Sequence, residues 1–291
     1  MGEALRECMH AMKEDPGLGK ALLRTAHVHL MLGDTSNARR YYSKAERAVG
    51  TSKEAEIGLH NCLSAEQDLS RLNLEHGVCR RAASSAAASV ESHSRLKQLL
   101  ATVDAKLAIT PHNVPLRALR CEVLSSAGRW SEARAACDKG LGTASLFTGD
   151  QRDTASQQGA LWLHTLGRVL YDQSLLAEAA EKLMEALQRS GAPQGSKPLL
   201  RLAQRLDAER NDGNSAFKRG DWAGAVAAYT RALAVDPSHL KFNALLYCNR
   251  AAAHGKQGQL QQALADCSSA IVLDPTYAKV RNQQQSCKCV L

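Results

Sequence analysis

The stretch DGNSAFKRGDWAGAVAAYTRALAVDP, residues 212–237, is rich in alanine and glycine and ends at Asp-Pro. From Gly220, intervals of five, seven and five residues lead to Ala225, Ala232 and Pro237. The same intervals recur 38 residues later in QGQLQQALADCSSAIVLDP, at Gly258, Ala263, Ala270 and Pro275. Self-similarity at a fixed period is typical of folds built from stacked repeats, so this rhythm decides how the rest of the chain is interpreted.

Partial copies of the pattern occupy most of the chain. Intervals of five and seven, or parts of them, recur at Gly33, Ala38 and Ala45, at Gly128, Ala133 and Gly140, at Ala179 and Ala186, and at Ala4, Ala11 and Pro16. Twelve residues before the first alanine of the fuller copies stands another small residue: Ala26, Cys121, Gly167, Gly213 or Ala251. The pattern resembles the tetratricopeptide repeat, a helix–turn–helix unit of about 34 residues. The resemblance implies an all-α superhelix (α-solenoid) of antiparallel helix hairpins.

The positions of the small residues have a physical reason in such a hairpin. Small side chains on facing sides let two helix axes approach to about 8–10 Å. A glycine suits the end of the first helix, where the chain turns through a left-handed conformation. A proline suits the end of the second, because it cannot continue a helix. No sustained strand-like alternation competes with this interpretation.

The pattern also predicts the domain organisation. Residues 1–193 are expected to form an N-terminal repeat array that begins inside a unit, and residues 198–291 a C-terminal repeat domain that ends inside one, entered by a long helix over 198–218. The stretch SGAPQGSKP separates them. A Ser/Ala-rich insertion at about 77–95 could be helical or a loop. The other predicted segments are helices over 2–14, 52–76, 95–109 and 276–289, hairpins over 18–48, 114–141, 160–189 and 206–275, and a loop leading into helix over 142–159.

Composition narrows the function classes. The chain has a net charge of +8 but only 4% aromatic residues, and its charges are interspersed. It has no phosphate-binding loop, nucleophile elbow or His-Glu-x-x-His sequence, so we expect no enzyme, no cofactor and no metal site. No apolar run approaches a membrane span, so we expect no membrane partner. The nine cysteines form no Cys-x-x-Cys pair and no signal peptide is evident, which favours a reducing compartment: the cytoplasm, and the nucleus as well.

Four polar side chains fall on successive first helices of the C-terminal repeats. Arg210 and Asn214 are four residues apart and therefore share a helix face. Asn249 lies on the next first helix and Lys279 on the third. In a repeat array these helices line one concave surface. Two cations and two amides there would suit a carboxylate, because charge-assisted hydrogen bonds are the strong ones.

This set resembles the carboxylate clamp of tetratricopeptide-repeat co-chaperones. The family pattern reads Lys, Asn, Asn, Lys and Arg; Gln283 takes the fifth place here, which removes a charge. The resemblance implies a co-chaperone adaptor that assists protein folding and binds the acidic C-terminal tails of heat-shock protein 70 and heat-shock protein 90. Lys20 and Arg24 match the Lys279 and Gln283 positions and indicate a second, partial clamp.

Three further features are the upstream array, the long linking helix and an extension between two units, which LKFNALLYCNR (residues 240–250) closes. Together they make the chain similar to DnaJ-type co-chaperones with tandem repeat domains before a J domain. That group acts on the heat-shock protein 70 ATPase through a His-Pro-Asp triplet, which this chain lacks. Two alternatives stay open: a general scaffold for other proteins with a vestigial clamp, and a basic solenoid that binds RNA. The scarcity of aromatic residues for base stacking counts against nucleic acid as a partner.

Overall fold

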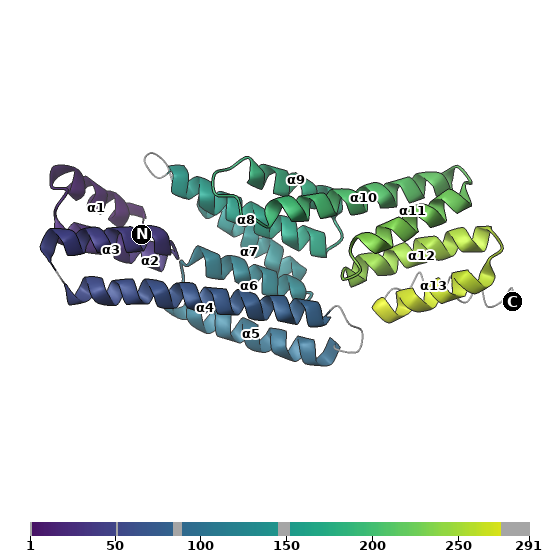
Figure 1. Ribbon diagram of the computed structural model, residues 1–291, viewed down its shortest axis with the longest axis horizontal. Helices are drawn as coiled ribbons and strands as arrows, with labels where there is room; N and C mark the ends of the chain where they lie inside the picture. The colour runs from purple at the N-terminus through teal and green to yellow at the C-terminus, as the bar shows by residue number, and fades with distance from the viewer. Residues whose placement is uncertain (1, 51, 84–88, 145–151, 275–291) are drawn as a thin grey trace. The chain divides into compact units, whose positions relative to one another are not determined.

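The computed structural model describes residues 2–50, 52–83, 89–144 and 152–274, and within these ranges all regular structure is α-helical (Figure 1). The helices are α1 (Gly2–Glu14), α2 (Gly19–Met31), α3 (Thr35–Val49), α4 (Lys53–Ala83), α5 (Ser89–Ile109), α6 (Val114–Ser126), α7 (Trp130–Ala144), α8 (Arg152–Asp172), α9 (Leu176–Leu187), α10 (Ser196–Lys218), α11 (Trp222–Val235), α12 (Leu240–Lys256) and α13 (Leu260–Leu273). The all-α prediction is confirmed. None of the helices in these ranges is both long and apolar enough to cross a membrane.

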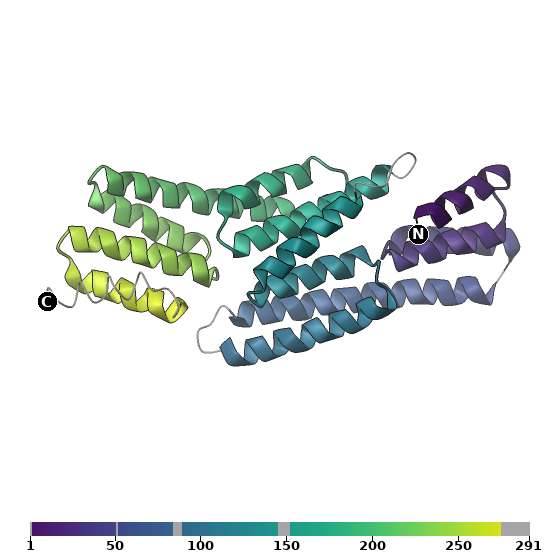
Figure 2. The same cartoon turned by 180° about the vertical axis from the view of Figure 1, so that it is seen from behind.

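The chain divides into two compact units. The first unit comprises residues 1–79 and 93–158, and the second comprises 80–92 and 159–291. In the first unit α2 packs on α1 and α3, and α6 packs on α7. In the second, each of α9 to α13 packs on the next, and this succession is visible from both sides (Figures 1 and 2). The predicted division of the array at residues 193 and 198 stays a prediction.

The small residues lie in the seams between paired helices, as the pattern predicted. Four of these alanines are completely buried: Ala225, Ala232, Ala263 and Ala270. Gly167 on α8 packs against α9, where an added Cβ would lie 2.7 Å from Leu183 Cγ. These residues therefore act as contact surfaces that bring the helix axes together.

The repeat glycines end the first helices in the left-handed conformation that the pattern predicted. Gly33, Gly128, Gly220 and Gly258 have φ of 79°, 76°, 79° and 75°. In the hairpin of α8 and α9 the corresponding residue is Ser174, whose φ is 69°. A serine therefore adopts here a backbone conformation that only glycine adopts without cost.

Several helix boundaries differ from the predicted ones. α4 continues past residue 76 to Ala83, and α5 starts at Ser89 and not at 95, so much of the Ser/Ala-rich segment is helical. Tertiary contacts explain the extension: Cys79 is buried, and Arg80 donates a 2.6 Å hydrogen bond to Asp172 Oδ1 on α8. α8 begins at Arg152, inside the segment expected to start as a loop. Residues 84–88, 145–151 and the predicted helix 276–289 lie outside the described residues.

Candidate peptide-binding site

The second unit places three members of the predicted clamp on neighbouring elements. Arg210 and Asn214 lie one turn apart on α10 and Asn249 lies on α12, each half-buried. α11 packs against both helices. Lys279 and Gln283 lie outside the described residues. The clamp as a whole therefore stays a prediction, and the geometry below concerns its first three members.

Arg210 connects α10 to α12. Its Cζ atom lies 5.9 Å from the centre of the Phe242 ring on α12, within the range of a cation–π interaction. Its Nη2 atom donates to Asp207 Oδ1 at 2.5 Å, and its Nε is buried without a hydrogen-bond partner in the described part of the chain. The guanidinium is held beside α12, but a carboxylate of its own helix already occupies one of its donors.

Asn214 is oriented by the second helix of its own hairpin. Its Oδ1 accepts a 2.8 Å hydrogen bond from the hydroxyl of Tyr229 on α11. Burial raises the pKa of Tyr229, so the phenol stays a donor at neutral pH. Since the amide oxygen is taken, Nδ2 is the atom that Asn214 can offer to a ligand.

Asn249 follows Phe242 by seven residues on α12, so the two side chains lie on one face of that helix, two turns apart. The next residue, Arg250, fixes this part of α12 to α13. It donates to both carboxylate oxygens of Asp266, at 2.8 and 2.7 Å, and to Thr230 on α11 at 2.9 Å. The bidentate pair is nearly buried and raises the pKa of Arg250. Asn249 therefore lies on a rigid stretch of helix.

The start of α12 is fixed to α8. The Tyr171 hydroxyl donates to Asp236 Oδ2 at 2.7 Å, and His239 Nε2 lies 2.8 Å from the Tyr171 carbonyl oxygen. Burial pushes the pKa of Asp236 up, but hydrogen bonds from Ser238 and Tyr171 outweigh it and leave that pKa below its usual value. Burial lowers the pKa of His239, so it is neutral at neutral pH and can cap α12 by accepting from the Phe242 N–H at 3.4 Å.

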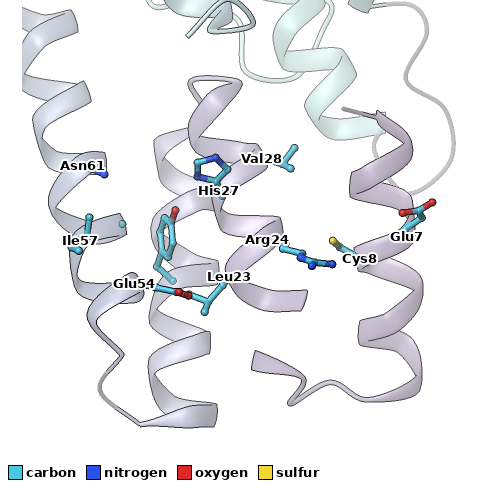
Figure 3. A pocket seen from close by; sticks show the side chains of 11 residues that line it. Glu7, Cys8, Leu23, Arg24, His27, Val28, Glu54, Ile57 and Asn61 are labelled. Atoms are coloured by element: carbon cyan, nitrogen blue, oxygen red, sulfur yellow. The ribbon is translucent and has the colours of Figure 1, made fainter. Parts of the chain in front are cut away.

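The two residues of the predicted second clamp have different surroundings. Arg24 on α2 lines a cavity of about 690 Å³ in the first unit, and its side chain extends toward Cys8 on α1 (Figure 3). Lys20, one turn earlier, is exposed and does not line this cavity. Their action as a pair stays a prediction. In the described residues no group of three or more His, Cys, Asp or Glu side chains could hold a metal ion.

Sequence comparisons match the repeat pattern. A family model described as "Tetratricopeptide repeat" matches residues 244–277, and one described as "TPR repeat" matches residues 213–258. The crystal structure of the P58(IPK) TPR domain superposes with a TM-score of 0.50 at 14% identity, covering 98% of this chain and 73% of that one. The chain is a tetratricopeptide-repeat solenoid.

This solenoid is homologous to DnaJ homolog subfamily C member 7. It is 28% identical to the mouse (Mus musculus) protein over 286 residues and 28% identical to the human (Homo sapiens) protein over 288 residues, in both cases covering 98% of this chain. The chain spans about half the length, 52%, of these relatives. The resemblance inferred from the repeat pattern and the linking helix is thereby confirmed.

Sequence reasoning missed the side chains that surround the clamp residues in this solenoid. Asp207 precedes Arg210 by three residues, which is the spacing of neighbours on a helix surface, so this contact could have been predicted. Tyr229 and Phe242 gave no such signal. Each reaches its partner across a helix interface, and only the packing of α10, α11 and α12 places them.

Proposed function

We propose that this solenoid is a non-catalytic co-chaperone adaptor in the cytoplasm that binds the acidic C-terminal tails of heat-shock protein 70 and heat-shock protein 90. The binding site is the concave surface of the second unit, and the residues are Arg210, Asn214, Asn249, Lys279 and Gln283. The observation that supports the proposal most directly is the contact between α10 and α12 through Arg210 and Phe242. It joins the helices that carry the first three residues. Homology to a DnaJ protein supports the class of partner.

The chemistry of recognition follows from the donors. A peptide that ends in Glu-Glu-Val-Asp presents a terminal carboxylate and acidic side chains. Asn214 Nδ2, the Asn249 amide and Lys279 donate hydrogen bonds to them, and a charge-assisted hydrogen bond contributes about 1.5–3 kcal/mol. Arg210 supplies charge and holds α12 in place. Because the contact is ionic, binding weakens as salt is added.

A scaffold for other proteins is the second candidate function, and one specific observation favours it. Arg210 is already paired with Asp207, and the fifth clamp position is Gln283. Both features reduce the positive charge available to an acidic tail. In this case the concave surface binds partners that do not end in a carboxylate-rich sequence.

Fluorescence anisotropy with a labelled peptide ending in Glu-Glu-Val-Asp separates the two functions. We expect saturable binding by the whole chain, and a loss of about tenfold in affinity in Asn249→Ala and in Lys279→Ala, from the missing charge-assisted hydrogen bond. Ser215→Ala is the matched control, since this exposed residue lies on α10 beside Asn214 and belongs to no clamp position.

A C-terminally amidated peptide is the ligand control, because it keeps every side chain and loses the terminal charge. It should bind much more weakly. Equal binding of the amidated peptide, or affinity that Asn249→Ala and Lys279→Ala leave unchanged, would contradict the clamp and support the scaffold.

A further inference from the structure

The first unit contains two adjacent cavities that share two lining residues. The larger, about 690 Å³, lies among α1, α2, α3 and α4 (Figure 3). The smaller, about 310 Å³, is lined by residues of α2, α4, α5 and α6 and of the turn after α5. His27 on α2 and Asn61 on α4 line both. We call the two cavities together the first-unit groove. Its length, over two consecutive hollows, suits an extended polypeptide better than a compact small molecule.

Each cavity presents apolar side chains to solvent. Leu23, Val28 and Ile57 line the larger one, and Ile57 is 59% exposed. Leu30, Met31 and Ile109 line the smaller, and Ile109 is 76% exposed. Burying such side chains under a ligand removes apolar surface from water and therefore favours binding. Each cavity therefore suits one apolar side chain of the bound segment.

The shared boundary of the two cavities is polar. His27 and Asn61 are exposed, and neither makes a hydrogen bond within the described part of the chain. An asparagine amide offers both a donor and an acceptor, which matches the C=O and N–H groups of a peptide backbone. Along its length the groove is therefore apolar, then polar, then apolar. An extended segment can place one side chain in each apolar part and its backbone groups beside the polar part.

The charges of the groove favour a basic segment. The two charged residues that line the smaller cavity, Lys106 and Asp68, are paired with each other at 2.6 Å, and Arg71, which does not line the cavity, contacts the same carboxylate at 3.4 Å. In the larger one Glu7 and Glu54 accompany Arg24, and none of these three is in an ion pair with another described residue. Two carboxylates against one guanidinium leave a surplus negative charge. An acidic tail would bring its carboxylates beside Glu7 and Glu54 and would be repelled.

We propose that the first-unit groove binds an extended, net basic segment of another protein, with one apolar side chain in each cavity and a Lys or Arg side chain beside Glu54. The second unit is proposed above to bind an acidic terminus, so the chain has two peptide sites of opposite charge preference. This assignment does not depend on the clamp.

Two labelled, C-terminally amidated peptides test it: Gly-Leu-Lys-Val-Leu-Ile-Gly and its counterpart with Glu in place of Lys. We expect the Lys peptide to bind the whole chain about tenfold more tightly, and Glu54→Gln to remove most of that difference. Ile57→Lys should abolish binding of both, because it fills the larger cavity with a charged chain. A Glu peptide that binds as tightly as the Lys peptide would overturn the proposal.

The chain provides matched controls for fold and for location. Leu63 lies on the same helix as Ile57 and is 49% exposed, but it lines neither cavity. Leu63→Lys should therefore leave peptide binding unchanged. Equal loss in Leu63→Lys and Ile57→Lys would mean that α4 is merely perturbed, which rejects the groove. Asn249→Ala in the second unit should also leave binding of the Lys peptide unchanged. Loss of binding in that variant would place the peptide in the other unit and would equally overturn the proposal.

Discussion

Gly213 on α10 lies directly against the ring of Tyr229 on α11: a Cβ atom at residue 213 would be 2.5 Å from Tyr229 Cε1. The tyrosine cannot move aside, because it is buried and its hydroxyl is bonded to Asn214. This contact links the repeat pattern to the candidate site. The residue that lets the two helices approach is the neighbour of a clamp residue, and the ring that fills the seam orients that clamp residue.

Gly213→Ala should therefore destabilise the second unit. The added methyl group overpacks a rigid seam, and such substitutions cost about 1–3 kcal/mol. Urea unfolding followed by circular dichroism measures this as a lower midpoint. Gly255→Ala on α12 is the control: an added Cβ there meets nothing within 4 Å, so the higher helix propensity of alanine should raise stability by about 0.5–1 kcal/mol. If Gly213→Ala also stabilised the protein, the seam would not be close-packed.

Ser174→Gly should stabilise the hairpin of α8 and α9. Ser174 has φ of 69°, and its hydroxyl is buried without a hydrogen-bond partner in the described part of the chain. Glycine removes the strain, about 1–2 kcal/mol, and the unsatisfied hydroxyl, about 1–3 kcal/mol, against an entropic cost of about 0.5–1 kcal/mol. The expected net gain is about 1–4 kcal/mol, read from the same urea titration.

The reverse change supplies the comparison. Gly258→Ser places a serine at φ 75°, where an added Cβ meets nothing within 4 Å. It should lose about 1 kcal/mol through backbone strain alone. A gain in Ser174→Gly together with a loss in Gly258→Ser is the result expected from strain in the left-handed turn, and equal signs would reject it.

The sequence predicted the fold wherever one position decides the backbone. Gly33, Gly128, Gly220 and Gly258 end helices because a left-handed turn needs glycine, and this requirement is local. In the hairpin of α8 and α9 a serine, Ser174, stands where the pattern has glycine, although the interval from Ala179 to Ala186 still located the hairpin. The extension of α4 was not predictable, since its last turn depends on Arg80 meeting Asp172 about ninety residues later.

The stability of the second unit should fall as pH drops below 7. His164 on α8 is buried, with Nδ1 2.9 Å from Ser196 Oγ on α10, and burial, aided by the charge of Arg168, lowers its pKa to about 4. The unfolded chain binds this proton more readily, so the contribution of His164 is complete above about pH 6.5 and is lost on the way down to about pH 4. The expected loss between about pH 7 and pH 5 is about 2 kcal/mol.

Urea titrations over this pH range measure the slope. Burial lowers the pKa of His239 as well, so it adds a loss of the same sign. His164→Asn should remove the contribution of His164 to the slope of unfolding free energy against pH, whatever the effect of the substitution on stability at neutral pH. His60→Asn, at an exposed position of α4 in the first unit, is the control for the substitution itself and should leave the stability of the second unit at neutral pH unchanged. A slope that His164→Asn does not change would exclude His164 as its source.

The candidate site was less accessible to sequence reasoning than the fold. Spacing alone indicated that Arg210 and Asn214 share a helix face, and α10 bears this out. The sequence alone shows Arg210 as a cation, and the structure adds that it is paired with Asp207. In the first unit the spacing predicts that Arg24 belongs to a partial clamp, and the structure adds that Glu7 and Glu54 line the same cavity from α1 and α4. Neighbours on other helices, which no local pattern reveals, set the net charge of a groove.

Asp207→Ala should tighten binding of the Glu-Glu-Val-Asp peptide if the clamp is correct. Asp207 accepts from Arg210 Nη2 and, through Oδ2, from Asn211 Nδ2 at 3.0 Å, so it competes with the ligand for the guanidinium. Its removal frees Arg210, which stays beside α12 through Phe242. We expect an affinity gain of about three- to tenfold and a steeper salt dependence, at a stability cost of about 0.3–0.5 kcal/mol for the lost helix pair.

Asp212→Ala is the matched control for this experiment. It removes the same charge from an exposed position of α10. Asp212 is two residues from Arg210 and therefore lies on a different face of the helix. Overall charge alone would make the two variants equal, whereas release of Arg210 makes Asp207→Ala distinctly stronger. Equal gains would reduce the effect to general electrostatics, and a loss of affinity in Asp207→Ala would mean that the Asp207–Arg210 pair positions the guanidinium for the ligand and does not compete with it.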